Sequence, residues 1–548
     1  MLQEAKQFDY IVVGGGTAGV VVAARISEER TRVLLLEAGP DYPNHIPPEL
    51  LDASLPVTSG HNWRLDAIVC DGRSSPPPGQ QARINRVFEV ASSFLPPGET
   101  FRKASESGTA TPFRYPLAKV MGGGSAINGC LALHARPEDY GAWAASGNND
   151  WNWDSVLPYI NRVANADSEK PALVTQVPQI HNLTRCQRAF FDACQTLGHS
   201  HVDLTQGTAA GVGAIPMSSR DGLRVSTSAL YLAAARKRAN LTIYPNCLVD
   251  RLLLDRGNGD LTATGVEAIV DGRRCRFSGG HIIVSAGAIN SPAILLRSGI
   301  GAVRELEQVN VRPLLNLAGV GKNLQDHAAV GIWAIPKEGY CLAREMIHQL
   351  LLQQKSSVSG PVCDVQLFML SAVPVHELPG LQRFIGTDHA IGVSTVLATP
   401  RSRGSVEIVS ADPLASPRTH LNCLYEPDDL RSMMEGVRSA WRIMRREPLA
   451  GQAAGFVLWD DKVVDSDVLA ERLIRTTVRT VWHPVGTLRM GNEKDGMSVV
   501  DQRGKLHGCR NVTVADASIM PVIPSVPTGL TCMVIGERIA AHLRGLAA

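Results

Sequence analysis

The chain has 548 residues, 44% of them hydrophobic and 19% charged, which is enough for more than one domain and a large core. Lys and Arg total 54 against 52 Asp and Glu, and no basic stripe stands out, which argues against nucleic acid as a partner. No run of about 18 apolar residues occurs, so no membrane span is expected.

The N-terminal segment has the order of a dinucleotide-binding βαβ unit. An apolar run, a glycine motif, a helical pattern and a second apolar run that ends in an acid follow one another as Tyr10–Val13, Gly14-Gly15-Gly16-Thr17-Ala18-Gly19, Val20–Ser27 and Val33–Glu37. Strand, G-x-G-x-x-G, helix, strand and acid in this order predict a nucleotide site, although the unit alone does not separate NAD from FAD.

Each part of this unit has a physical task. Gly14 permits the tight turn, Gly16 lets the backbone approach a pyrophosphate, and Gly19 lets the helix pack close to the strand. The helix N-terminus offers N–H groups and a positive dipole to the phosphates. Glu37 can accept both hydroxyls of an adenosine ribose, and its charge disfavours a 2′-phosphate.

A long irregular segment and a second glycine-rich stretch come next. Residues 71–114 are rich in proline, and loops longer than about 15 residues are usually functional or disordered. In Lys119–Gly129, small residues leave backbone N–H groups free to approach a flat or anionic ligand, and the alternative is a flexible turn. The stretch is not a hydrolase nucleophile elbow, because Ile127 stands where G-x-S-x-G needs its last glycine.

The following segments predict ordinary elements. We expect strands over Asn240–Tyr244 and Leu248–Leu254, another over His281–Ser285, and a half-buried strand over Ser405–Val409. A shorter irregular segment runs from Glu377 to Asp388. We expect a helix over Asp428–Arg446, with Asp428 as a plausible N-cap, and a closing helix over Thr528–Leu543.

The segment Val481–Thr487 looks most like a catalytic loop, because Pro and Gly would hold the imidazole of His483 in place. The ordinary pKa of histidine, near 6.5, suits a general base at neutral pH. A satisfied structural histidine is the competing interpretation, and on this local evidence alone it is the one we favour for His483 and for His327 alike. Asp516 ends a strand, where it can cap the next helix or hold a ligand hydroxyl.

The 11 cysteines form no C-x-x-C pair and no Cys/His metal spacing, which predicts reduced thiols and no metal site. The first strand begins near Asp9, so no secretory signal is expected. These features predict a cytoplasmic protein.

Four stretches together resemble the glucose–methanol–choline (GMC) family of FAD oxidoreductases from about Asp9 to Leu543. They are VVGGGTAG with LLLEAGP, KVMGGGSAINGC leading into PEDYGAW, SAGAINSPAILLRSGIG followed by GVGKNLQDH, and WHPVGTLRMG followed by VVD and VTVADASIMPVIPS. Their order along the chain makes the resemblance specific.

The resemblance implies an α/β fold with two domains. A Rossmann-like FAD domain would be assembled from residues 1–150, 201–325 and 480–548. A substrate domain with an antiparallel sheet flanked by helices would take residues 151–200 and 326–479. The 71–114 segment is longer than the family pattern, and a lid, a substrate tunnel wall and a subunit contact are the alternatives for it. The implied reaction is oxidation of an alcohol by hydride transfer to flavin N5, with His483 as the base.

By position in the family motifs, a larger set is expected to bind FAD: Gly14, Gly16, Thr17, Ala18, Gly19, Glu37, Ala38, Gly122, Gly124, Ser125, Asn128, Gly129, Val249, Ala286, Trp482, Asp516, Ala517 and Thr528.

The chain departs from the family pattern at several positions. A second His or Asn usually stands opposite the catalytic histidine, but here the position is Pro527, which has no side-chain donor or acceptor. Ile127 occupies the position of the histidine that carries covalent flavin in some members, so noncovalent FAD is expected. His134-Ala135 replaces a common Arg-Gly pair.

The leading hypothesis is an FAD-dependent oxidase or dehydrogenase for a small primary alcohol, including aromatic or heteroaromatic ones. Its partners would be that alcohol and an electron acceptor, oxygen or another carrier. A flavin lyase or photodecarboxylase and a flavin-binding protein without turnover are the alternatives, the latter because of Pro527. The sequence leaves the oligomeric state open.

Overall fold

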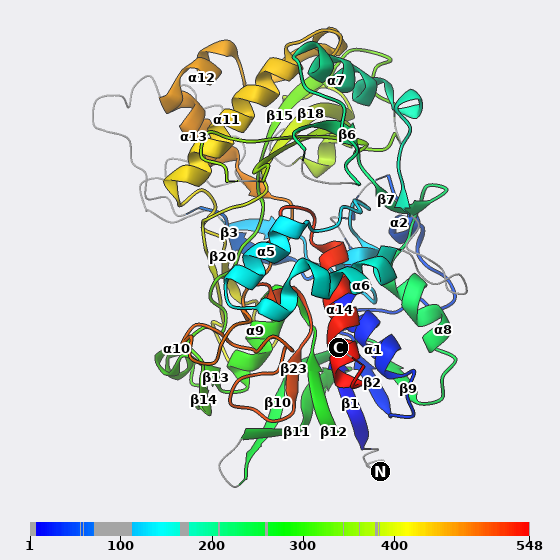
Figure 1. Cartoon of the computed structure of the whole chain (residues 1–548), viewed down its shortest axis with the longest axis vertical. Coiled ribbons are helices and arrows are strands. Elements are labelled where there is room, and N and C mark those ends of the chain that lie inside the picture. Colours follow the sequence, from blue (N-terminus) through cyan, green and yellow to red (C-terminus); the bar gives the residue numbers. More distant parts are fainter. Residues whose placement is uncertain are drawn as a thin grey trace.

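The computed structural model describes residues 7–546 apart from 55, 58–59, 71–111, 165–174, 206–208, 258–260, 343–344, 361, 379–381 and 383. It has a mixed α/β fold with a largely parallel sheet at one end and an antiparallel sheet at the other (Figure 1). The chain passes between the two ends several times, so each end is assembled from separate segments.

The parallel sheet carries the predicted nucleotide unit. Its strands are β1 (Phe8–Val13), β2 (Val33–Leu36), β9 (Leu241–Tyr244), the C-terminal part of β12 (Arg273–Val284) and β23 (Val512–Val514), in the order β23-β12-β1-β2-β9. β10 (Cys247–Arg256) and β11 (Leu261–Val270) extend it through antiparallel pairing with β12. β2 and the second half of β1 are buried apolar runs, as expected for the centre of a sheet covered on both faces.

Two helices from opposite ends of the chain pack beside this sheet. α1 (Thr17–Ile26) lies against α14 (Gly529–Leu543), as Figure 1 also shows. The helices approach closely, because a Cβ on Gly536 would lie 2.9 Å from the carbonyl oxygen of Ala18. Arg25 and the buried Glu537 join them with an ion pair of 2.8 Å. The C-terminal helix therefore supports the helix that follows the glycine motif.

The antiparallel sheet forms the second end. Its order is β21 (Ala453–Val457), β15 (Ala328–Pro336), β18 (His389–Leu397), β17 (Val365–Pro374), β16 (Leu350–Gln354) and β6 (Gly211–Ala214), with β22 (Arg479–Thr480) beside β15. α7 (Arg185–Thr196) and α11 (Pro427–Met444) pack on one face. Val365, Leu367 and Met369 of β17 pack in the core with those helices, whereas Phe368 and Leu370 join the core of the nucleotide part.

The remaining helices are α2 (Pro48–Leu51), α5 (Pro137–Ala145), α6 (Trp153–Ala164), α8 (Ala233–Ala235), α9 (Gly287–Arg297), α10 (Val303–Gln308), α12 (Asp461–Asp465) and α13 (Asp467–Thr477). The remaining strands are β3 (Leu65–Ile68), β4 (Pro112–Tyr115), β5 (Thr175–Gln176), β7 (Met217–Arg220), β8 (Leu223–Arg224), β13 (Ile300–Gly301), β14 (Leu315–Asn316), β19 (Ser405–Glu407) and β20 (Arg418–His420). Within the described residues, no helix is both long and apolar enough to cross a membrane.

Three sequence-based expectations need correction. Asp428 is not the N-cap of α11, because Pro427 already occupies its first turn and Glu426 is the cap. The predicted irregular segment 71–114 ends in β4, which pairs with β3, and residues 71–111 lie outside the described part. β6 comes from the range assigned to the FAD domain, yet it pairs with β16 at the edge of the antiparallel sheet.

Candidate active site

The turn after β1 is shaped to receive a phosphate group. Gly14 has a φ of +101°, and a Cβ there would lie 2.4 Å from the carbonyl oxygen of Ser285. A Cβ on Gly19 would lie 2.0 Å from the carbonyl oxygen of Gly14, whereas the nearest atom to one on Gly16 is 3.8 Å away. Among the described residues no side chain caps α1, so its first N–H groups are open there. This cradle fits a pyrophosphate.

Glu37 directly follows β2 and is held at the edge of this turn. Its two carboxylate oxygens accept hydrogen bonds from the backbone N–H groups of Gly15 (2.8 Å) and Gly39 (2.7 Å). Burial raises the pKa of Glu37 to about 7, against the lowering effect of those backbone donors and of Lys119. Each oxygen keeps further acceptor capacity, so the fixed carboxylate can still accept ribose hydroxyls.

The structure brings the two glycine-rich stretches together. The N–H of Gly122 donates to the carbonyl oxygen of Gly15 at 2.7 Å, and the N–H of Ser125 donates to Thr17 Oγ1 at 3.1 Å. Ser125 Oγ donates to the carbonyl oxygen of Gly122 and accepts from the N–H of Thr227, so this hydroxyl has a structural task. Residues 14–19 and 122–129 therefore frame one site.

Asp516 ties the ends of further elements to this frame. Its carboxylate accepts from the N–H groups of Gly287 (2.9 Å) and Ser518 (2.8 Å) and from Ser291 Oγ (2.5 Å). The bond from Ser518 makes Asp516 the cap of the short 3-10 helix Ala517–Ile519, as predicted. Burial raises the pKa of Asp516.

Other residues that were predicted to bind FAD lie at or near the ends of helices and strands. Ala286 is the N-cap of α9 and Thr528 is the N-cap of α14. Val249 is buried in β10, and Ala38 follows Glu37. Gly124 and Asn128 belong to the second glycine stretch, where Asn128 Oδ1 accepts from the N–H of Cys130 at 3.1 Å.

His483 faces a second histidine that the sequence analysis interpreted as merely structural. The Nδ1 atoms of His483 and His327 are 2.9 Å apart, and Nε2 of His327 lies 3.0 Å from the carbonyl oxygen of Pro524. A carbonyl only accepts, so His327 carries its proton on Nε2, and its Nδ1 lone pair accepts from Nδ1–H of His483. In the neutral ring of His483, Nε2 is then left without a proton.

The loop around His483 is fixed by buried polar groups. Its backbone N–H donates to Asp326 Oδ1 at 2.8 Å, and the hydroxyl of Tyr115 donates to the other oxygen of Asp326. Burial raises the pKa of Asp326 to about 6. Trp482, 36% exposed, has a φ of +62°, a conformation that a bulky residue adopts only when its surroundings impose it.

The electrostatics correct the expectation of a histidine that titrates near neutrality. Burial, and then the neighbouring His327, hold the pKa of His483 well below its usual range. Burial also lowers the pKa of His327 to about 4. Both rings are therefore neutral at pH 7, which is the state that the assigned tautomers require.

Pro527 lies three residues after Pro524, whose carbonyl oxygen accepts from His327. It is buried two residues before α14, and its side chain contributes neither donor nor acceptor. Nearby, Gln366 of β17 donates from its side-chain amide to the carbonyl oxygen of Ser525 at 2.8 Å. This bond joins the antiparallel sheet to the segment that accepts from His327.

The sheet face beyond Gln366 is aromatic and apolar. Two rows of residues run across strands β17, β18 and β15. One row is Phe368, Ser394 and Gly331, and the next is Leu370, Gly392 and Trp333. The indole of Trp333 lies across the two glycines, because a Cβ on Gly331 or Gly392 would lie 2.5 Å or 2.7 Å from it. This aromatic sheet face, defined by Trp333, Phe368 and Leu370, was missed from the sequence; the alternation of β15 was the available signal.

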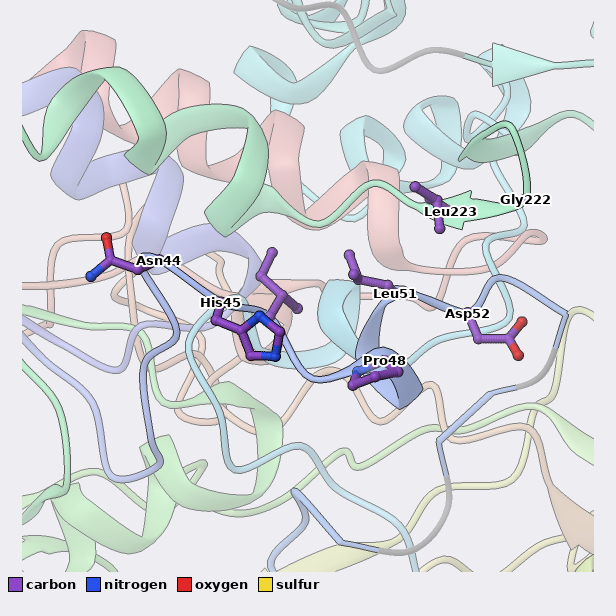
Figure 2. A pocket seen from close by; sticks show the side chains of 8 residues that line it. Asn44, His45, Pro48, Leu51, Asp52, Gly222 and Leu223 are labelled. Atoms are coloured by element: carbon purple, nitrogen blue, oxygen red, sulfur yellow. The ribbon is translucent and has the colours of Figure 1, made fainter.

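A separate pocket of about 600 Å³ lies near α2 and the turn before β8 (Figure 2). Its lining comprises Asn44, His45, Ile46, Pro48, Leu51, Asp52, Gly222 and Leu223. None of these residues is among those predicted to bind the flavin or the alcohol.

Comparison with known proteins gives consistent matches. Two models described as GMC oxidoreductase match residues 8–329 and 400–536. Glucose dehydrogenase (FAD, quinone) of Drosophila pseudoobscura pseudoobscura is 30% identical, covering 98% of this chain and 87% of that protein. The 5-(hydroxymethyl)furfural oxidase of Methylovorus sp. (strain MP688) is 31% identical, covering 97% of this chain and 98% of that protein.

Among solved structures, pyridoxine 4-oxidase from Mesorbium loti superimposes with a TM-score of 0.83 at 24% identity. The match covers 98% of this chain and 99% of that one. This likeness confirms the fold class, with its parallel and antiparallel sheets.

Proposed function

This chain belongs to the GMC oxidoreductase family of FAD enzymes that act on CH–OH donors, and from that premise we propose that it oxidises a small, ring-bearing primary alcohol to the aldehyde. His483 is the base in this proposal. The observation that carries it is the 2.9 Å contact between the Nδ1 atoms of His483 and His327, together with the 3.0 Å contact between His327 Nε2 and the carbonyl oxygen of Pro524.

The arrangement supports proton removal at a defined atom. With Nδ1–H held by His327, the free Nε2 of His483 can accept the hydroxyl proton of an alcohol. The resulting imidazolium keeps its hydrogen bond to His327, and the Asp326 carboxylate keeps the backbone of His483 in place. Bound FAD supplies the acceptor for the hydride that leaves the carbinol carbon.

The substrate class is supported by Pro527 and by the aromatic sheet face, whose strand β17 also carries Gln366, bonded to Ser525 next to the acceptor of His327. Pro527 adds no polar group, and the aromatic sheet face presents Trp333, Phe368 and Leu370. Flat rings pack well against such side chains. The relative that oxidises 5-(hydroxymethyl)furfural gives independent support for a compact, ring-borne primary alcohol.

Noncovalent attachment of FAD is part of the proposal. Ile127 is buried in an apolar cluster with Leu50, Val120 and Ala126, and its side chain offers no nucleophile. Acid or heat denaturation should release the yellow chromophore into the supernatant. Colour that stays with the precipitated protein would contradict this part.

Anaerobic mixing with candidate alcohols tests the proposed activity. Primary ring alcohols should bleach the flavin absorbance in the dark, because only oxidation of the alcohol reduces the cofactor. Readmitting oxygen, or adding a quinone, then shows which acceptor reoxidises it. If no primary alcohol bleaches the flavin, the proposal fails, and a lyase or a binding protein gains support.

A further inference from the structure

His348 is a half-buried imidazole close to the candidate active site without a task in the mechanism above. It lies two residues before β16. Its Nδ1 is sealed from solvent and has no hydrogen-bond partner among the described residues. A buried N–H without an acceptor is costly, so the sealed position of Nδ1 bears on which ring nitrogen carries the proton.

The ring contacts two parts of the site. It meets Phe368 of the aromatic sheet face edge-on, with ring centroids 6.4 Å apart and planes at 83°. A Cβ on Gly129 would lie 3.5 Å from Cδ2 and 3.6 Å from Nε2 of His348. The Nε2 edge therefore faces the end of the glycine stretch 122–129, and no side chain of Gly129 stands in front of it.

The surroundings decide which ring nitrogen carries the proton. Burial lowers the pKa of His348 to about 4, so the ring is neutral at pH 7 and has one N–H and one lone pair. An orphaned buried N–H is rarer in proteins than an under-satisfied acceptor. The sealed Nδ1 is accordingly the lone pair, and the N–H is on Nε2, at the open edge.

We propose that the Nε2–H of His348 binds the substrate by donating to a hydrogen-bond acceptor on its ring, away from the reacting carbinol. This inference rests on the proposed function. It narrows the substrate to aromatic or heteroaromatic primary alcohols that carry a carbonyl or a similar acceptor. His483 receives the hydroxyl proton at one end of such a molecule, and His348 holds the other end.

Two matched alcohols test this role. 5-(Hydroxymethyl)furfural carries a formyl acceptor, and furfuryl alcohol has the same ring without it. His348→Phe keeps the ring shape and removes the donor, whereas His348→Gln retains an N–H near the position of Nε2. His376→Phe, at a surface histidine whose side chain is 76% exposed, is the control.

We expect His348→Phe to lower kcat/KM for 5-(hydroxymethyl)furfural by roughly 5- to 100-fold, mainly by raising KM. The same substitution should change kcat/KM for furfuryl alcohol by less than about threefold. His348→Gln should recover much of the loss, and the control should match the parent. Equal losses on both alcohols in His348→Phe, with no recovery in His348→Gln, would overturn the inference.

A binding measurement separates this inference from the proposed activity. Furfural, which carries a formyl acceptor, and 2-methylfuran, which has the same ring without it, are titrated into the FAD-loaded protein, and the change in flavin absorbance gives each dissociation constant. His348→Phe should weaken the binding of furfural only. If the parent binds furfural selectively but reduces flavin with neither alcohol, the proposed function fails while the role of His348 stands. Equal affinity of parent and His348→Phe for furfural refutes that role.

Discussion

Replacing His327 with leucine should slow flavin reduction without releasing FAD, because His327 acts as a positioning residue for His483. The two Nδ1 atoms are 2.9 Å apart, and His327 is 3% exposed. Leaving the Nδ1–H of His483 without an acceptor costs about 1–3 kcal/mol. At about 1.36 kcal/mol per factor of ten, this corresponds to roughly a 5- to 150-fold slower reaction.

His327→Asn is the matched variant, because its side-chain oxygen can accept the same N–H. Anaerobic stopped-flow absorbance would follow flavin reduction, with FAD content and thermal unfolding measured on each protein. His327→Asn should recover most of the rate lost in His327→Leu. Parent-like reduction by His327→Leu, or equal slowing in both variants, would refute the tautomer argument.

Three further predictions concern the cofactor, the pH response and the missing polar group. Glu37→Ala should weaken FAD binding by about 10- to 150-fold, since charge-assisted bonds contribute about 1.5–3 kcal/mol. Glu29→Ala, at the surface, should leave FAD binding unchanged. Equal retention of FAD by the two variants in a dialysis series would contradict this. The rate of flavin reduction should be flat above pH 6.5 and fall only in acid, because the lowered pKa keeps the base unprotonated at neutral pH; a stopped-flow profile still rising above pH 7 would count against it. Pro527→Asn should change that rate by far less than the loss of His483, and a gain of about 10²–10⁴-fold would instead mark the native protein as a degenerate member.

Local sequence signals predicted the first part of the fold well. β2 and the end of β1 fall where the apolar runs place them, because strand, glycine turn and helix are contiguous and each residue type has one task there. The cap of α11 was misplaced by two residues, since Asp is a favoured cap type and Glu is not, and only Pro427 at the first helical position marks the earlier start.

The site itself needed tertiary information. His327 and His483 are 156 residues apart, and nothing in either local segment indicates that their rings meet. Likewise, Phe368, Ser394 and Gly331 share a face only because three strands pair in one register. A motif can mark one histidine as a candidate, but its protonation depends on the partner that the fold supplies.

The rate of flavin reduction in His483→Ala tests the central claim most directly. Under anaerobic conditions, with FAD retained and a primary ring alcohol as donor, reduction should be slower than in the parent by about 10²–10⁴-fold. Reduction at the parent rate would show that His483 Nε2 is not the base, and the proposed mechanism would be wrong.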